Sequence, residues 1–285
     1  MQNFFVKSHG LGNDYIVLNQ NEIRFKLTEK AIRKICDVHF GIGSDGILLK
    51  VPSLNADFGL RILNPDGSEA EKSGNGLRIF AKYLYDYKFT KEKRFTIETI
   101  GGLVQAEIID EKNSKALAIK VNMGKAKFSS ASVPVKCPKP ECIDEILHLE
   151  YRDYTISCVS VGNPHCVIIT DNLDKKEVKI FGPQIETNPL FPNRINVQFA
   201  KIISPQEVQI MIWERGAGWT LASGSSACAV AAVMTKKGLT NPNLDIIMEG
   251  GNLKIEIDPD WDINMTGEVR EIASGQISRE LIDNL

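Results

Sequence analysis

The sequence predicts an α/β protein of the α+β kind, built as two similar halves. Three observations support this fold class: landmarks that recur at a spacing of about 150 residues, many short runs of β-branched and aromatic residues between Gly, Asn and Asp, and two helical stretches that each open on Ser-Gly. The length of 285 residues agrees with two domains of roughly 150 residues each.

The repeat is visible in several unrelated motifs. Gly12-Asn13-Asp14, which precedes an apolar run, matches Gly162-Asn163-Pro164 at a shift of 150 residues. Ser73-Gly74 matches Ser223-Gly224 at the same shift, and Gly101-Gly102 matches Gly250-Gly251 at 149. Because independent landmarks keep one spacing, we infer two halves with the same order of elements: strand, strand, helix, paired strands, helix, further strands.

The first half shows this order most clearly. Thr28 to Cys36, with Thr28 as the expected N-cap, and Gly74 to Tyr87 are predicted to be helices. The predicted strands are Phe4 to Val6, Tyr15 to Leu18, Gly46 to Val51, Phe58 to Leu63, Phe95 to Thr99, Leu103 to Ile109 and Ala116 to Val121.

A linker is predicted in Gly124 to Cys142, where Pro134, Pro138 and Pro140 stand among Ser and Lys. We therefore expect an N-terminal lobe over residues 1–126 and a C-terminal lobe over 127–266. The strand-like stretch from Gly267 to Ser278 follows the second repeat, and residues 267–285 are expected to return to the first lobe.

The composition excludes several classes of protein. Apolar residues make up 43% and charged residues 25%, which fits neither a disordered nor a fibrous chain. The 34 Lys and Arg nearly balance 36 Asp and Glu, so no footprint for nucleic acid or an anionic membrane is present. The N-terminus lacks the pattern of a signal peptide, and no window of about 18 apolar residues exists. We expect a cytoplasmic protein.

The cysteines do not form a recognisable metal or disulfide pattern. All six are scattered and none forms a CxxC pair, so reduced thiols are expected. Cys137 and Cys142 with His148 are spaced too loosely for zinc and lack a fourth ligand. We expect no metal.

The main chemical signal is a pair of glycine-rich turns that feed the two long helices. We call residues 64–76 and 214–226 the first and second helix mouths. Glycine lets a ligand approach the backbone, and the first N–H groups of a helix are donors at the positive end of its dipole. Each mouth is therefore a candidate anion site, for instance for a carboxylate. The simpler interpretation is that Ser73 and Ser223 are ordinary N-caps.

Polar residues near both mouths favour the ligand interpretation. Arg215 has the planar fork that suits a second carboxylate, and the repeat places His165 near the second mouth as a charge partner. Other polar residues that could reach a ligand stand at turns marked by Gly or Pro: Asn13, Asn64, Asn163, Asn196 and Glu214.

These motifs resemble those of the diaminopimelate epimerases, a family of cofactor-independent two-base racemases and epimerases. The resemblance extends over essentially the whole chain. Its motifs are long and collectively specific: residues 10–15 (GLGNDY), 64–68 (NPDGS), 74–78 (GNGLR), 162–165 (GNPH), 194–197 (RINV) and 214–218 (ERGAG).

The resemblance implies two pseudo-symmetric halves, each a sheet or barrel around a central helix, with the active site in the cleft between them. It implies inversion of one α-carbon, converting LL- to meso-2,6-diaminopimelate for lysine and peptidoglycan synthesis. One base removes the α-proton while an acid on the other face returns one. No cofactor is implied, the partner is the small-molecule substrate, and a homodimer is left open.

Carried over residue by residue, the resemblance places Ser73 and Ser223 at the positions of the two bases, with His165 and Glu214 tuning them. The backbone N–H groups of Gly74, Asn75, Gly224 and Ser225 would hold the α-carboxylate. The distal end of the substrate would be fixed by Asn13, Asn64, Asn163, Asn196 and Arg215, and Ser44 lies in a stretch that lines the site in relatives.

The chain departs from the family at the two bases, which are cysteines in relatives. A helix N-terminus and a nearby cation can bring a thiol to the thiolate form, whereas a hydroxyl needs a dedicated base. We therefore expect substrate binding with very slow turnover or none. The serines are either a deliberate exchange or a natural divergence toward amino acid binding or a different racemase substrate. Ser226 stands where the family has glycine.

Overall fold

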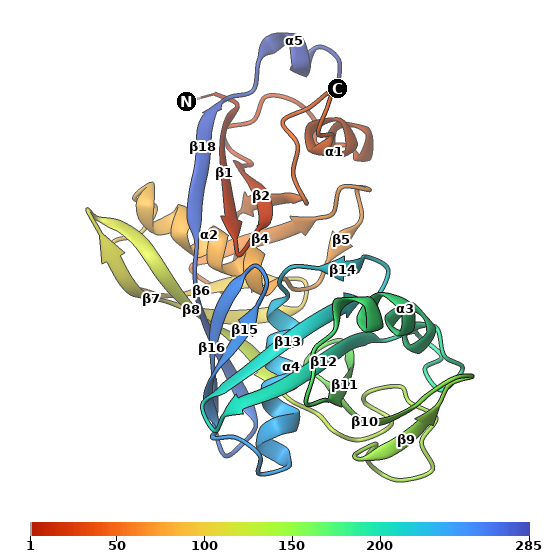
Figure 1. Ribbon diagram of the computed structural model, residues 1–285. Helices are drawn as coiled ribbons and strands as arrows, with labels where there is room; N and C mark the ends of the chain where they lie inside the picture. Colours follow the sequence, from red (N-terminus) through yellow and green to blue (C-terminus); the bar gives the residue numbers. More distant parts are fainter. Residues whose placement is uncertain (1) are drawn as a thin grey trace. The chain divides into compact units, whose positions relative to one another are not determined.

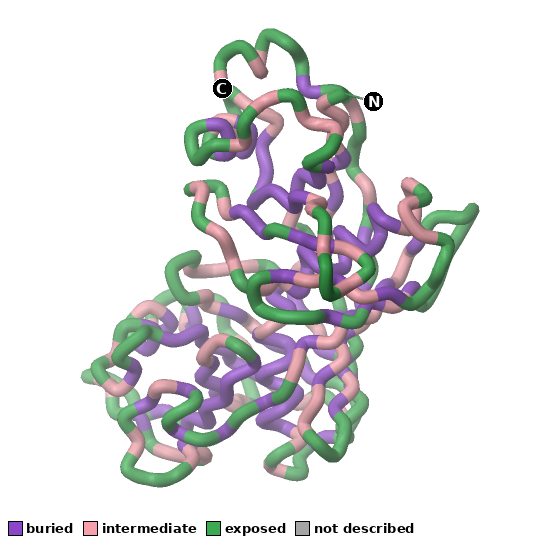
Figure 2. The backbone as a smooth tube through the Cα atoms, turned by 180° about the vertical axis from the view of Figure 1, so that it is seen from behind, coloured by how far each residue is buried: buried purple, intermediate pink, exposed green. Residues whose placement is uncertain are grey.

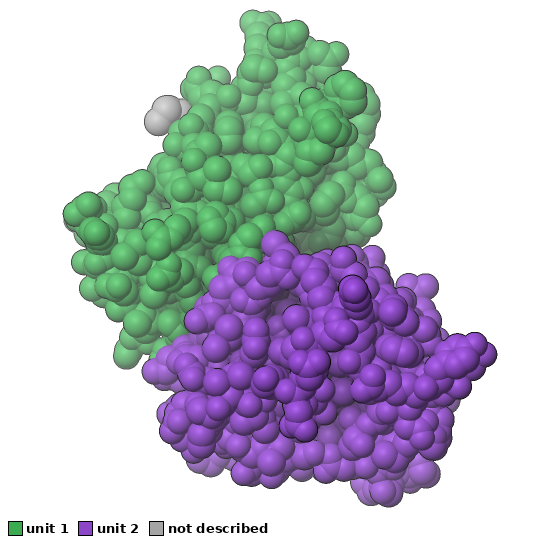
Figure 3. All heavy atoms as spheres, in the orientation of Figure 1, with its two compact units in different colours: residues 1–121, 266–285 green, residues 122–265 purple. Residues whose placement is uncertain are grey.

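A computed structural model gives the structure of the protein and describes residues 2–285. The chain divides into two compact units (Figures 1 and 3). Unit 1 consists of residues 1–121 and 266–285, and unit 2 consists of residues 122–265. The chain passes from one unit to the other within strand β8 and again within strand β17.

Unit 1 is a mixed sheet with helices. Its elements in chain order are β1 (Phe4–Gly10), β2 (Asn13–Asn19), α1 (Glu29–Cys36), β3 (Ile47–Val51), β4 (Phe58–Leu63), β5 (Glu69–Ala70), α2 (Gly74–Asp86), β6 (Arg94–Thr99), β7 (Gly102–Lys112), β8 (Lys115–Lys125), the end of β17 (Asp262–Glu268), β18 (Arg270–Gln276) and α5 (Arg279–Ile282).

Unit 2 has the same kind of content. Its elements are β9 (Glu145–His148), β10 (Asp153–Ser160), β11 (Pro164–Ile169), α3 (Lys175–Glu186), β12 (Asn196–Ser204), β13 (Glu207–Glu214), β14 (Gly218–Thr220), α4 (Gly224–Lys236), β15 (Asn243–Met248), β16 (Gly251–Ile257) and most of β17.

The internal repeat holds at the level of strand register. β1, β2, β3 and β4 pair antiparallel, parallel and antiparallel in turn, and β10, β11, β12 and β13 do the same. Val17 faces Leu48 in the first unit, and Val167 faces Gln198 in the second. Both residues of the second pair lie 150 positions after the first, so the two units can be compared residue by residue. In unit 1, β18 adds an antiparallel strand to β1.

Each unit encloses one long helix on all sides. Every residue of α2 from Gly74 to Leu84 is buried, and α4 is buried from Gly224 to Met234 except for Ser225 (Figure 2). The strands β1, β2 and β7 pack on α2, and β10 to β13, β15 and β16 pack on α4. Because a helix buried all round needs partners on every side, the sheet of each unit must curve around it. The predicted fold class is confirmed.

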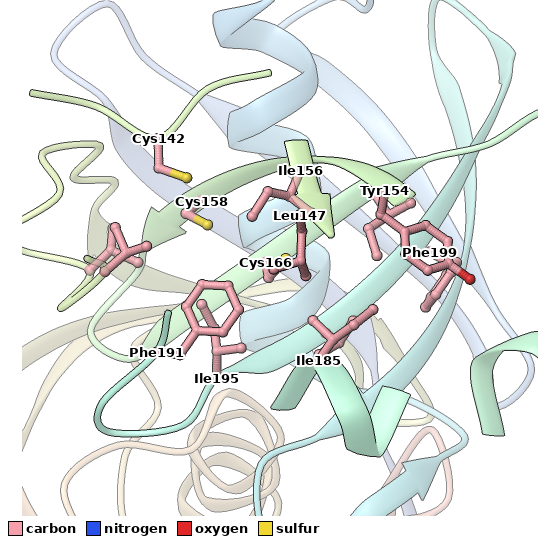
Figure 4. Packing of buried hydrophobic residues seen from close by; sticks show 14 of the residues in the cluster. Cys142, Leu147, Tyr154, Ile156, Cys158, Cys166, Ile185, Phe191, Ile195 and Phe199 are labelled. Carbon is pink, nitrogen blue, oxygen red and sulfur yellow. The ribbon is translucent and has the colours of Figure 1, made fainter. Parts of the chain in front are cut away.

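The predicted linker is wrong over much of its length. Val133, Val135 and Cys142 are buried in the core of unit 2, which also contains Phe191 and Phe199 (Figure 4). The segment is tied down by backbone hydrogen bonds in both directions between Lys127 and Ser160, each 2.8 Å long. The prolines therefore shape a packed segment that buries apolar side chains, rather than a free connection.

Candidate active site

In unit 1 the predicted site gathers at the start of α2. Ser73 is the N-cap of this helix, and its Oγ accepts a hydrogen bond from the Gly76 N–H at 3.1 Å. The hydroxyl of Tyr15, on β2, lies 3.3 Å from the same oxygen. Gly74 and Asn75 form the first turn, where the N–H groups have no intrahelical acceptor. The first helix mouth thus combines a hydroxyl, a phenol and a helix N-terminus.

Asn13, at the start of β2, is held against this turn by its side chain. Its Oδ1 accepts from Asn75 Nδ2 at 3.1 Å, and its Nδ2 donates to Asp45 Oδ2 at 2.8 Å. Arg78 Nη2 donates to Asn75 Oδ1 at 2.7 Å from one turn further along the helix. The amide of Asn75 is therefore fixed from two sides, which orders the beginning of α2.

Ser44 and Asn64 engage their own turns. The Ser44 hydroxyl is buried and donates to the Gly46 carbonyl at 2.8 Å. The Asn64 side chain donates to the Ser68 hydroxyl at 2.9 Å. These bonds stabilise the two turns, and a role for either residue toward a ligand stays a prediction.

The second helix mouth repeats the geometry of the first. Ser223 is the N-cap of α4 with φ −147° and ψ 123°, close to the −138° and 117° of Ser73. Its Oγ accepts from the Ser226 N–H at 3.4 Å and lies 3.4 Å from the Ser225 Oγ. Gly224 opens the helix. The two serines therefore occupy equivalent positions at equivalent helices.

His165 connects β11 to this mouth. The side chain is fully buried, its Nε2 lies 2.9 Å from Asn163 Oδ1, and Asn163 Nδ2 lies 3.5 Å from the Ser225 Oγ. Burial lowers the pKa of His165 to about 3, against a smaller opposing effect of the neighbouring Gln198 side chain. The imidazole is therefore neutral at pH 7.

Glu214 brings a carboxyl group to Ser223. It stands at the end of β13, where burial raises its pKa above the ordinary value. The neighbouring hydroxyl groups of Ser223 and Thr220 oppose that rise. A carboxylate can take a proton from a neighbouring hydroxyl, whereas the phenol beside Ser73 is itself ordinarily protonated at neutral pH. The two serines thus differ in the partner that could activate them.

Asn196 and Arg215 complete the second mouth. Asn196 Oδ1 accepts from the Arg215 N–H at 3.0 Å, and its Nδ2 donates to the Pro164 carbonyl at 2.9 Å. The Arg215 side chain is exposed, and its Nη1 donates to the Asn193 carbonyl at 3.0 Å. The guanidinium keeps further donors for a carboxylate.

Sequence reasoning missed two supporting residues. The Glu186 carboxylate accepts from Trp213 Nε1 at 2.8 Å and from the Gly216 N–H at 2.9 Å, which secures the turn after β13. Gln198 is fully buried and donates to the Ser226 Oγ at 3.0 Å. A glutamine between the apolar residues Val197 and Phe199 was the available signal for the second residue.

The structure adds two observations on other kinds of site. Within residues 2–285, no group of three His, Cys, Asp or Glu side chains is arranged to hold a metal ion. His148 is exposed and lies 2.9 Å from Asp153, and all six cysteines are free thiols. None of the helices described is both long enough and apolar enough to span a bilayer.

Comparison with solved structures supports the fold. A hydroxyproline epimerase of Agrobacterium vitis superimposes with a TM-score of 0.72 at 13% identity, over 96% of this chain and 90% of that one. A methylitaconate-delta-isomerase gives a TM-score of 0.67 at 14% identity, over 99% of this chain and 97% of that one. At such identities the likeness concerns the two-unit fold alone.

Sequence comparison identifies the family. The family model for diaminopimelate epimerase matches residues 5–129 and 157–272. Diaminopimelate epimerase 2 of Nostoc sp. is 49% identical over 97% of this chain and 96% of that protein. The diaminopimelate epimerase of Pelotomaculum thermopropionicum is 39% identical over 95% of this chain and 98% of that protein. With matches of this extent in both halves, the chain belongs to the diaminopimelate epimerase family.

Proposed function

We propose that this chain binds diaminopimelate and that serine at positions 73 and 223 makes its interconversion of the LL and meso forms very slow or absent. The observation that carries the proposal is the pair of equivalent N-caps, at which the same Ser-Gly sequence opens a helix in each unit. A two-base epimerase needs one proton-transfer group for each face of the α-carbon. A fold of two equivalent units supplies two residues at equivalent positions for this purpose.

The two mouths offer donors for the reacting carboxylate. The backbone N–H groups of Gly74 and Asn75, and of Gly224 and Ser225, belong to the first turns of α2 and α4. Donors of this kind stabilise charge that develops on a carboxylate as the α-proton leaves. No metal or organic cofactor enters the proposal.

The proposed loss of turnover follows from acidity. A thiol with an ordinary pKa near 8.5 is about 3% thiolate at pH 7. A hydroxyl with acidity comparable to that of water ionises to only about one part in 10⁹. Ser223 has the Glu214 carboxyl as a partner and Ser73 has the Tyr15 phenol, so residual proton transfer should depend on Glu214.

The distal carboxylate of diaminopimelate is proposed to bind Arg215. Lysine is the matched analogue, because it has the same chain and two amino groups but lacks that carboxylate. Arg215 is anchored through its backbone to Asn196 while its side chain is exposed. A bidentate bond to the ligand would therefore need only a local change of the guanidinium.

Isothermal calorimetry with diaminopimelate and with lysine tests the proposal. We expect measurable binding of diaminopimelate and at least tenfold weaker binding of lysine, because one charge-assisted hydrogen bond contributes about 1.5 to 3 kcal/mol. Arg215→Ala should remove most of this preference. Arg152→Ala, which changes an exposed arginine elsewhere in unit 2, is the control.

The alternatives correspond to other outcomes. Equal affinity for lysine and diaminopimelate would favour a racemase for a monocarboxylic amino acid. Binding of diaminopimelate without α-proton exchange, even after both cysteines are introduced, would favour an amino acid binding protein. Absence of binding to either compound would refute the proposal.

A further inference from the structure

A buried polar cluster lies beside the second helix mouth, and two of its members, Gln198 and Ser226, have no polar equivalent in unit 1. His165 and Gln198 lie on the face of the β11–β12 pair that is turned toward α4, because Gln198 reaches the Ser226 Oγ. The alternate residues Cys166 and Val197 lie on the opposite face, in the core of unit 2. His165, Gln198 and Ser226 are all fully buried. Such groups are costly to bury unless each finds a hydrogen-bonding partner.

The equivalent positions in unit 1 show what the fold requires there. Leu48 corresponds to Gln198 and Gly76 to Ser226, at the same register and the same helical turn. A Cβ on Gly76 would meet Leu48 Cδ2 at 3.0 Å. An apolar residue with glycine therefore fills this space in unit 1, and the fold does not need the polar pair of unit 2.

Two buried atoms of this cluster determine which of its groups donate hydrogen bonds and which accept them. His165 Nδ1 and Gln198 Oε1 lack a partner at hydrogen-bonding geometry within residues 2–285. With the Asn163 Oδ1 facing the ring as an acceptor, His165 Nε2 donates to it and is the protonated nitrogen. In a neutral imidazole the Nδ1 then has a lone pair, which needs a donor. The two ends of an amide are interchangeable in shape, so Gln198 can present its nitrogen to His165 and its oxygen to the Ser226 hydroxyl.

That orientation satisfies both atoms and connects the cluster to Ser223. Asn163 Nδ2 donates to the Ser225 Oγ, and Ser225 lies within hydrogen-bonding distance of Ser223. We propose that these groups form a hydrogen-bond chain with one direction, in which the donors in order are Ser226, Gln198, His165, Asn163 and Ser225, and that Ser223 is the last acceptor.

The chain sets the direction in which the Ser223 hydroxyl points. Its oxygen accepts from the Ser226 N–H and from the Ser225 hydroxyl, which fills both lone pairs. The Ser223 proton is then directed to the carboxyl group of Glu214. This role rests on the proposed function, since it concerns the group at the second base position. Gln198 is accordingly a positioning residue, which acts on Ser223 through His165, Asn163 and Ser225.

The test uses ¹⁵N-histidine labelled protein and reads the protonation of each ring nitrogen by NMR. His165 is identified by comparison with His165→Gln. We expect a single neutral tautomer with the proton on Nε2. In Gln198→Leu the donor to Nδ1 is lost, and the tautomer with the proton on Nδ1 should become populated. Gln198→Leu combined with Ser226→Gly copies the unit 1 pair and should give the same change in a folded protein. A proton on Nδ1 in the parent, or an unchanged tautomer in both variants, would overturn the inference.

Kinetics then separate positioning from structure. With cysteine introduced at positions 73 and 223, Gln198→Leu should lower kcat about tenfold and leave KM within about twofold. Unchanged kcat would show that Gln198 only fills space. If the double cysteine protein has no activity, the proposed function fails, while the tautomer measurement still decides the hydrogen-bond chain.

Discussion

Replacing serine by cysteine at either helix mouth should destabilise the unit that contains it, even though it restores the family's catalytic group. Ser73 Oγ accepts from the Gly76 N–H at 3.1 Å, and Ser223 Oγ accepts from the Ser226 N–H at 3.4 Å. Sulfur is a weak acceptor, so each exchange weakens an N-cap. We expect a loss of about 1 kcal/mol for Ser73→Cys and about 0.5 kcal/mol for Ser223→Cys, because the second bond is longer.

The measurement is the free energy of unfolding in urea, supported by thermal scans under reducing conditions. For units of 141 and 144 residues (121 plus 20, and 265 minus 121), 1 kcal/mol corresponds to a shift of about 3 °C in Tm. Ser114→Cys, in the exposed turn between β7 and β8, is the control for adding a thiol. A Ser73→Cys protein as stable as the parent, or a larger loss at position 223, would refute the reasoning.

Three further predictions concern the second mouth. Arg215→Ala should weaken diaminopimelate binding about tenfold or more in calorimetry without changing Tm; an unchanged affinity would contradict the assigned role. Glu214→Gln removes a carboxyl group whose pKa is raised by burial. In the parent, the stability that this group contributes is present below the ordinary Glu pKa and is lost as the pH rises. The free energy of unfolding of the variant in urea should therefore increase relative to that of the parent between pH 4 and pH 8. The pKa of His165 is lowered to about 3, so its contribution to the free energy of unfolding is fully present above about pH 6.5 and falls by about 2 kcal/mol by pH 5. His165→Gln should lose that part of the dependence of stability on pH. An identical dependence in variant and parent would be evidence against a buried neutral imidazole.

Elements whose sequence pattern depends only on neighbouring residues were predicted correctly. The Phe58–Leu63 strand has its predicted bounds, and Thr28 accepts from the Ala31 N–H as the N-cap of α1. The 150-residue repeat predicted the shared order of elements because both units bury an equivalent helix. Strands β5 and β14 were missed because two or three residues contain no detectable periodicity.

The remaining features depend on distant contacts. Residues 124–142 resemble a linker by their prolines, but the burial of Val133 and Val135 depends on strands that follow later in the chain. The same holds for the site. The sequence motifs indicated His165, Asn163 and the two serines as site residues. Only the packing of β12 against α4 shows that Gln198 and Ser226 are part of the same cluster.

The decisive measurement for the proposed role of residues 73 and 223 is the rate of α-proton exchange of diaminopimelate in D₂O. It is compared between the parent and the protein with cysteine at both positions. Oxygen in place of sulfur should hold the parent near the uncatalysed background, and the double cysteine protein should exchange at least about a thousandfold faster, since the ionised fractions of the two groups differ by about seven orders of magnitude. Equal rates in the two proteins, whether fast or undetectable, would contradict the claim that these two atoms limit turnover.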